Sequence, residues 1–244
     1  GNGYVNTFNP DGTQRDIYIG DNVDGLLCAD CDSFNLAQFD EIQPEFERYN
    51  VNFKVNYDVT EDLNAYFEAK YVNSEGESIG QPAFFFGDPR NTISIDNPYL
   101  DDSVRTLMEE ANDGEGVDSI NVLRMMTDLG RRIENNTRET TRFVAGLKGT
   151  VLEDWDLDAS VVRGKTELER VNGANMILDN YSFALDAIED DEGNIVCRSE
   201  AARADGCVPV NIMGFGAPSQ EAIDYINTVS TGTSEITQTV VSAS

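Results

Sequence analysis

Strict alternation of apolar and polar residues marks two stretches of the chain. In VNFKVNYDV (residues 51–59) every second residue is apolar, and after the polar link TED the alternation resumes in LNAYFEAKY (residues 63–71). A period of two places alternate side chains on opposite faces of a β-strand, and a short polar link fits a tight turn between antiparallel strands. The pattern therefore predicts a β-hairpin with one apolar face.

The same design recurs further along the chain. FVAGLKGTV (residues 143–151) alternates in the same way, and the link LEDW leads into DLDASVVRGK (residues 156–165). In the latter segment Leu157, Ala159 and Val161 alternate with Asp158 and Ser160. We predict a second hairpin here, with the form strand, acidic turn, strand.

Both hairpins extend beyond their apolar halves into polar sequence, and long connections separate them. Compact soluble domains rarely contain loops of this length. We therefore divide the chain into a leading loop (1–43), a hairpin (44–74), a long loop (75–135), a second hairpin (136–171), a second long loop (172–230) and the start of a further strand (231–244).

Short helices are predicted inside the long loops. Helical spacing of apolar residues indicates one helix over residues 100–113, with Ser103 or Asp102 as its N-cap, and another over residues 179–191. Two shorter helices are expected after Ser199 and Ser219, because serine is a favoured N-cap residue. The predicted fold class is all-β, with small helices in the loops.

Short turns on one side and long loops on the other are typical of a transmembrane β-barrel. Each apolar half covers about nine residues, close to the roughly 9–11 that cross a bilayer as a tilted strand. Tyr57, Tyr71 and Trp155 stand where an aromatic girdle would lie. In this interpretation the chain is a partial barrel. The predicted membrane-facing residues are Val51, Phe53, Val55, Phe67, Phe143 and Leu147. The alternative is a soluble antiparallel sheet with one face packed on a core.

Charge and composition exclude several functions. The chain has 45 acidic and 17 basic residues, a formal net charge of −28 and no histidine. Such a charge repels nucleic acid, so we expect no nucleic-acid partner. The chain also lacks a G-x-S-x-G nucleophile elbow and a glycine-rich phosphate loop. We therefore expect neither an enzyme nor a cofactor, and no segment nominates a metal site.

Several segments of the chain resemble those of one protein family. GNIVCRSEAARADGCVPVNIMGFGAPSQEAIDYI (residues 193–226), followed by SEITQTVVSAS (residues 234–244), resembles a block of TonB-dependent outer-membrane receptors of Gram-negative bacteria. The segments 47–75 and 142–167 resemble barrel hairpins of that family. The resemblance covers roughly residues 44–244, and its most specific part is 197–225.

The resemblance implies a barrel of about 22 strands whose lumen is closed by an N-terminal plug domain. Such receptors bind a scarce nutrient outside the cell, namely a siderophore, cobalamin or glycan, and import it with energy from the TonB complex. The present sequence contains no plug domain and no TonB box, so we expect an excised fragment that does not transport by itself. Its expected partners are the nutrient ligand, outer-membrane lipid, and the TonB complex through the missing plug. The alternative function is a soluble, acidic extracellular binding or adhesion module.

An outer-membrane location bears on the four cysteines, because such proteins mature in an oxidising compartment. We expect a disulfide between Cys197 and Cys207, since two thiols without histidine make a poor zinc site. Cys28 and Cys31 form a C-x-x-C pair among acidic residues, which should raise the thiol pKa values and disfavour redox catalysis. We expect a local Cys28–Cys31 disulfide or pairing outside this chain.

Three consecutive aromatic residues, Phe84, Phe85 and Phe86, lie in the first long loop between two prolines. As an exposed triplet they could stack on a ligand such as a sugar ring. Alternatively, they form a small core beneath the loop. We retain them as a candidate ligand-contacting loop.

Overall fold

A computed structural model of the 244-residue chain describes residues 8–9, 11–16, 18, 22–24, 27–29, 36–85, 91–111, 114–152 and 155–244. The chain forms two compact units, each assembled from separate segments. One, the loop unit, comprises Gly1–Asp40, Gly80–Arg132 and Gly173–Val229. The other, the sheet unit, comprises Glu41–Ile79, Ile133–Asn172 and Ser230–Ser244.

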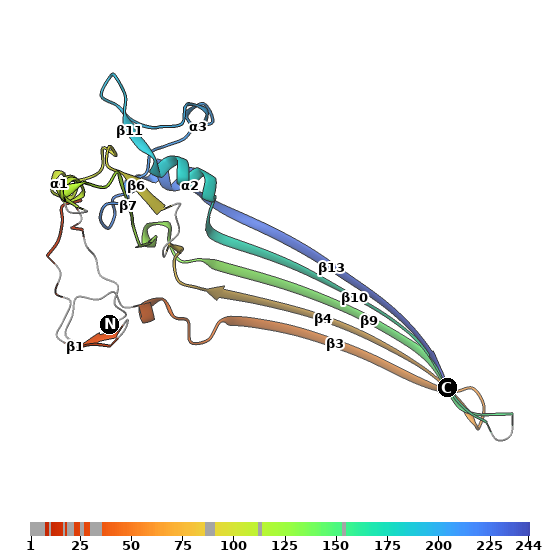
Figure 1. Ribbon diagram of the computed structural model, residues 1–244. Coiled ribbons are helices and arrows are strands. Elements are labelled where there is room, and N and C mark those ends of the chain that lie inside the picture. Colours follow the sequence, from red (N-terminus) through yellow and green to blue (C-terminus); the bar gives the residue numbers. More distant parts are fainter. Residues whose placement is uncertain are drawn as a thin grey trace. The chain divides into compact units, whose positions relative to one another are not determined.

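The sheet unit is built on five long strands that lie side by side (Figure 1). Their order is β13-β10-β9-β4-β3, and both β3 with β4 and β4 with β9 pair in antiparallel fashion. The sheet is open rather than closed, with β3 and β13 at its edges. The strands are β3 (Glu45–Asp58), β4 (Leu63–Ile79), β9 (Ile133–Val151), β10 (Trp155–Met176) and β13 (Asn227–Ala243).

Both predicted hairpins are present, β3–β4 and β9–β10. In the first, the backbone N–H groups of Val59 and Thr60 both donate to the carbonyl oxygen of Leu63, at 2.8 and 3.2 Å. The strands are longer than predicted: β4 continues to Ile79 and β9 begins at Ile133. The segment predicted as a loop over 75–135 therefore starts and ends inside strands. Ladder hydrogen bonds use backbone groups, so pairing continues where the side chains are polar on both faces.

The loop unit contains short elements instead of long strands. Its strands pair as β1 with β2, β5 with β8, β6 with β7 and β11 with β12. The elements are β1 (Asn22–Asp24), β2 (Leu27–Ala29), η1 (Leu36–Phe39), β5 (Phe84–Phe85), β6 (Thr92–Ser94), α1 (Asp102–Glu110), β7 (Ser119–Asn121), β8 (Arg124–Met125), η4 (Thr127–Leu129), α2 (Leu178–Leu185), β11 (Ala187–Glu189), β12 (Ile195–Cys197), α3 (Glu200–Ala204) and α4 (Gln220–Ile226).

This unit has a hydrophobic core of its own, drawn from both long connections. Two fully buried polar groups lie beside it: the Tyr181 hydroxyl donates to Asn91 Oδ1, and Asn97 Nδ2 donates to the Leu185 carbonyl at 2.9 Å. The core residues are Ile93, Leu100, Val104, Met108, Met126, Leu129, Tyr181, Ala184, Leu185, Val210, Ile212, Met213, Ala222 and Ile226.

The predicted helices form, with two corrections. Ser199 and Ser219 cap α3 and α4 by accepting a hydrogen bond from the N–H three residues on, as expected. The N-cap of α1 is Asp101, whose side chain accepts from the Ser103 N–H, and not Ser103 or Asp102. The helix predicted over 179–191 ends at Leu185, because residues 187–189 instead pair with Ile195–Cys197 as β11 and β12.

Candidate functional site

The register of the sheet unit separates its side chains into two faces. Val51 stands opposite Tyr71, and Tyr71 opposite Thr141, so odd-numbered residues of β3, β4 and β9 share one face. Even-numbered residues share the other. We call them the odd face and the even face. Thr140 Oγ1 of β9 lies 3.1 Å from Thr166 Oγ1 of β10, so the even-numbered residues of β10 are on the even face as well.

The half of the odd face nearest the turns is an exposed apolar band. It includes every residue predicted to face lipid, and Phe53 is 57% exposed. The Phe67 ring lies 6.4 Å from Phe53 on one neighbouring strand and 6.4 Å from Phe143 on the other. The large exposed members of the band are Val51, Phe53, Val55, Tyr57, Phe67, Tyr71, Phe143, Leu147, Trp155 and Val161.

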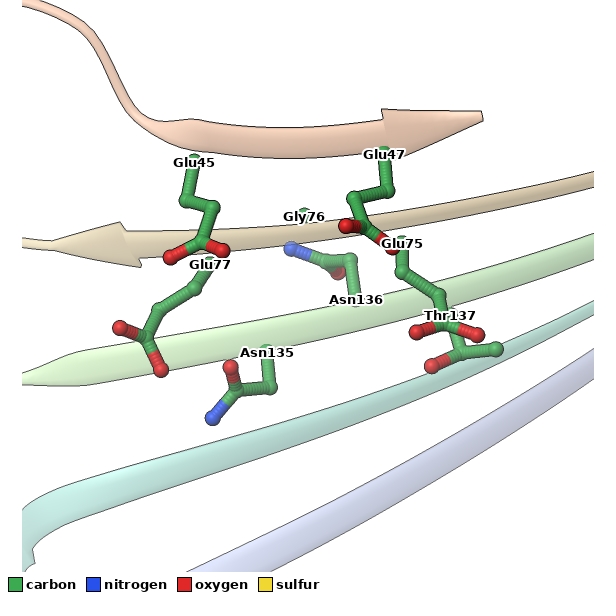
Figure 2. Close-up of a pocket in the computed structure, with 8 residues that line it drawn as sticks. All are labelled: Glu45, Glu47, Glu75, Gly76, Glu77, Asn135, Asn136 and Thr137. Atoms are coloured by element: carbon green, nitrogen blue, oxygen red, sulfur yellow. The ribbon is translucent and has the colours of Figure 1, made fainter. Parts of the chain in front are cut away.

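Beyond the apolar band, the odd face becomes acidic. Glu45 stands directly opposite Glu77, and Glu47 directly opposite Glu75. Figure 2 shows these four carboxylates along β3 and β4, around a hollow of about 340 Å³ that Asn135, Asn136 and Thr137 also line. Within the described part of the chain, no group of three or more His, Cys, Asp or Glu side chains is arranged to hold a metal ion.

The even face is polar and carries most of the cations of the sheet unit. Lys70 stands directly opposite Arg142, and Ser74 lies between Arg48 and Arg138 in one row across three strands. These side chains line a second hollow of about 690 Å³. Sequence alternation alone had marked these positions only as polar.

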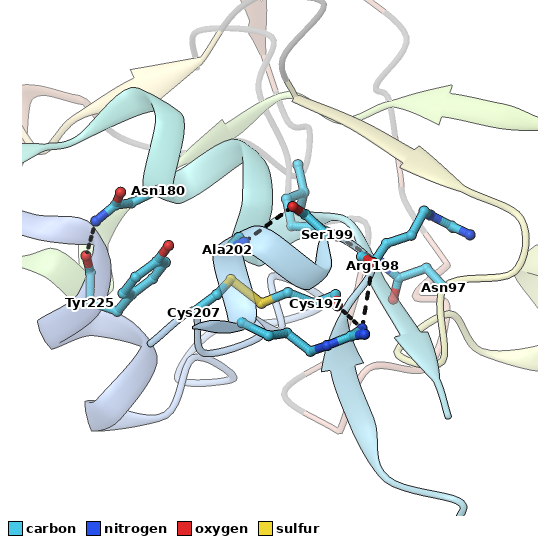
Figure 3. The surroundings of a disulfide bond; sticks show 10 residues. Asn97, Asn180, Cys197, Arg198, Ser199, Ala202, Cys207 and Tyr225 are labelled. Carbon is cyan, nitrogen blue, oxygen red and sulfur yellow. Dashed lines mark hydrogen bonds between the residues drawn. A yellow bond between two sulfur atoms is a disulfide. The ribbon is translucent and has the colours of Figure 1, made fainter. Parts of the chain in front are cut away.

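The predicted Cys197–Cys207 disulfide is present in the loop unit (Figure 3). The two Cα atoms lie 6.3 Å apart, and Cys197 is fully buried. The bond joins the end of β12 to Cys207, three residues after the end of α3, and the Cys207 N–H donates to the Ala202 carbonyl at 2.8 Å. Arg203 Nη1 donates to the Cys197 carbonyl at 2.7 Å. The bond therefore fixes a short helix against a strand, which is a structural role.

An arginine with two acidic partners lies close to this bond in the sequence. Arg198 Nη2 is 2.8 Å from Asp96 Oδ1, and Arg198 Nε is 2.9 Å from Asp186 Oδ1. Hydrogen bonds from Arg198 and Ser94 hold the pKa of Asp96 below its usual value. The two carboxylates raise the pKa of Arg198, so the guanidinium stays charged. Arg198 ties the first long connection to the second.

A buried ion pair, which the sequence did not predict, holds the loop around residues 214–216 in place. Arg124 forms an ion pair with Asp128, and the two side chains are 12% and 6% exposed. Arg124 Nη1 also donates to the Gly214 carbonyl at 2.8 Å, while Asp128 Oδ1 accepts from the Gly216 N–H at 2.8 Å. Phe215 lies between these two anchored glycines and is exposed.

The remaining predicted site residues are described only in part. Phe84 is in β5 and half-exposed, with the Arg132 guanidinium 5.8 Å from its ring centroid. The side chain of Phe85 and all of Phe86 lie outside the described residues. The side chain of Cys28 and all of Cys31 also lie outside them, so the Cys28–Cys31 pairing stays a prediction.

No family model, curated protein or solved structure matches the chain. Among the described residues, no helix is both long enough and apolar enough to pass through a membrane.

Proposed function

We propose that this chain is part of an outer-membrane receptor of a Gram-negative bacterium, of the TonB-dependent kind. The complete receptor binds a scarce nutrient (a siderophore, cobalamin or glycan) outside the cell and imports it with TonB-coupled energy. The fragment supplies barrel strands and extracellular loops and does not transport alone. The observation that carries the proposal is the apolar band on the odd face of a five-stranded sheet.

The dimensions and chemistry of the band support a lipid-facing role. The segment of β4 that carries the band, Leu63–Tyr71, is nine residues long, close to the roughly 9–11 needed for a tilted strand to cross the hydrocarbon core. Tyr71 lies at the end of the band towards the acidic half, and Tyr57 and Trp155 lie at the end near the turns. Aromatic residues favour the two membrane–water interfaces. The polar even face would then line the lumen.

The disulfide and the separate core of the loop unit also support this proposal. An extracellular loop cannot rely on the bilayer for burial, so it needs a core and covalent constraint of its own. The same two features favour the second candidate, a soluble acidic extracellular binding or adhesion module. That candidate leaves the apolar band without a covering partner.

A matched pair of tryptophan probes tests the proposal. Phe67 and Tyr66 are consecutive residues of β4 on opposite faces, and Trp155 is the only natural tryptophan. In a Trp155→Phe background, Phe67→Trp and Tyr66→Trp each place one fluorophore at almost the same depth. The protein is reconstituted in phosphatidylcholine vesicles that contain brominated acyl chains, which quench fluorophores in contact with them.

We expect strong quenching and a blue-shifted emission for Phe67→Trp, and weak quenching for Tyr66→Trp. Equal quenching of the two probes would overturn the lipid-facing assignment, as would recovery of the whole protein in the lipid-free fraction. A stable, detergent-free monomer in light scattering would instead favour the soluble module. Growth of a strain lacking the encoding gene on iron chelates, cobalamins and glycans then identifies the imported nutrient.

A further inference from the structure

Four cations on the even face of the sheet unit lie close together without an acidic partner. Arg48, Lys70, Arg138 and Arg142 occupy three adjacent strands, and Lys70 and Arg142 are directly opposite each other. Among the described residues, none of the four lies within 4.0 Å of a carboxylate oxygen. We call these four residues the cationic patch.

The arrangement is unfavourable for folding. Like charges directly opposite one another on neighbouring strands destabilise a sheet, whereas opposite charges stabilise it. The same face contains the favourable arrangement nearby, since Lys54 is paired with Glu68 at 2.7 Å. Glu134 lies 3.7 Å from Arg170. The cationic patch contains no ion pair of this kind among the described residues, although the chain has 45 acidic residues. Glu68, which already pairs with Lys54, is also attracted by the charge of Arg142.

The patch also has the shape of a binding site. All four cations line the hollow of about 690 Å³, which is within the usual range of roughly 300–1,000 Å³ for small-ligand pockets. Val72 lines the same hollow and is nevertheless buried, so the long side chains around it cover the sheet there. Ser74 and Thr140 add hydroxyl groups between the cations. Glu45 and Glu77 lie at the end of the hollow towards the acidic half of the strands.

We propose that the cationic patch binds a small soluble polyanion that carries carboxylate or phosphate groups. Arginine presents a planar fork of donors that matches the oxygens of both groups. Directly opposite side chains are about 5 Å apart, and residues two strands apart are about 10 Å apart. These spacings suit a ligand with at least two anionic groups.

The net charge of the chain explains why several cations are needed together. At −28 the protein as a whole repels anions. Charges more than about 8 Å from a site are largely screened at physiological ionic strength, so a local cluster can reverse the sign of the field that a ligand experiences. This inference deepens the proposed function and rests on it in one respect, because the even face is the face that would line the lumen. Anion binding is measured separately from lipid contact, so either proposal can fail without the other.

Calorimetry on the 244-residue chain in neutral detergent micelles tests the proposal, with tripolyphosphate and citrate as probes at fixed ionic strength. We expect both anions to bind the wild type. Arg138→Gln together with Arg142→Gln should weaken binding by at least about tenfold, because the double substitution removes two charges and their charge-assisted hydrogen bonds. The matched control, Arg163→Gln with Lys165→Gln, removes the same charge from the odd face and should leave the affinity within about twofold.

A second variant separates loss of the site from loss of the fold. Ser74→Glu places a carboxylate between Arg48 and Arg138, so it should abolish anion binding while raising the unfolding midpoint of the sheet. Absence of binding to the wild type overturns the proposal, as does equal weakening in the Arg138/Arg142 and Arg163/Lys165 variants. Binding of polyglutamate or anionic vesicles without binding of the two small anions also overturns it, in favour of a macromolecular partner.

Discussion

The ring of Tyr66 on β4 lies over the Cα atom of Gly146, which stands directly opposite it on β9. A Cβ atom at position 146 would lie 2.4 Å from the Tyr66 Cζ atom, so any larger residue displaces the ring. The glycine therefore creates the space in which the aromatic side chain packs flat on the sheet.

We expect Gly146→Ala to lower the free energy of unfolding of the sheet by about 1–2 kcal/mol, through overpacking. In a Tyr66→Ala background the same substitution should be neutral or stabilising by up to about 1 kcal/mol, because alanine loses less backbone entropy than glycine. Urea unfolding followed by Trp155 fluorescence completes this double-mutant cycle. Additive effects of the two substitutions would show that the ring does not depend on the glycine.

The Arg124–Asp128 pair predicts a large asymmetry between single and double substitutions. Asp128→Asn leaves a buried guanidinium without its counter-charge and should destabilise the loop unit by about 3–5 kcal/mol. Arg124→Met with Asp128→Leu removes both charges and should cost considerably less. Thermal unfolding measures both variants. A double variant as unstable as Asp128→Asn would mean that the hydrogen bonds of Arg124 to the loop, rather than the charge balance, dominate.

Reduction of the Cys197–Cys207 disulfide should loosen the middle of the second long connection. For a sequence separation of 10 residues, chain entropy gives a stabilisation of about 2.7 kcal/mol. We expect faster amide hydrogen exchange in β12 and α3 after reduction, or in the Cys197→Ala/Cys207→Ala variant. Peptides from β3 and β4 serve as internal controls and should be unaffected. Unchanged exchange in β12 would show that the surrounding core alone holds this segment.

The ion pairs of Arg198 predict a dependence of stability on acid pH. Hydrogen bonds from Arg198 and Ser94 lower the pKa of Asp96 in the folded state below its ordinary value of 3.8. The stabilisation of the fold by ionised Asp96 is therefore complete above pH 3.8, and it is lost as the pH falls through the lower pKa of the folded state. Both partners are partly exposed, so we expect Asp96→Asn to cost only about 0.5 kcal/mol at pH 6.

Because protonation removes the same interaction from the wild type, the difference between Asp96→Asn and wild type should shrink towards zero near pH 2. Comparison with wild type at each pH cancels the general effect of acid on so acidic a chain. Urea unfolding at pH 6, 4 and 2 gives the three differences. A constant difference across this range would show that Arg198 does not stabilise the ionised form of Asp96.

The two hairpins could be predicted because period-2 alternation and a short acidic link are local signals. Each strand of a hairpin determines the position of its partner through the turn. The pairing of β4 with β9 carries no local signal, since the loop between them spans residues 80–132. The cationic patch depends on this pairing. In the sequence Lys70 and Arg142 are two of many polar residues, and only the register of β4 with β9 shows that they lie opposite each other.

Within the loop unit, two kinds of prediction failed. The position of a helix N-cap was wrong where neighbouring residues are chemically equivalent, and the secondary structure was wrong where tertiary contacts determine it. Asp101, Asp102 and Ser103 all suit an N-cap, and the observed cap is the first of them. Residues 187–189 have helical spacing but pair with β12 as a strand, an example of tertiary context overriding local preference. The Arg124–Asp128 pair was missed because a single buried arginine has no characteristic sequence pattern.

The length of β10 has a consequence for how a receptor of this kind would select its ligand. The strand runs 22 residues from Trp155 to Met176 without a break, which is about 70 Å at roughly 3.3 Å per residue. Even when tilted by about 40°, it stands about 55 Å tall, against a hydrocarbon core of about 30 Å. Much of the barrel wall would then rise into water as a vestibule. A solute would be sorted by size and charge in that vestibule before it reached the level of the bilayer.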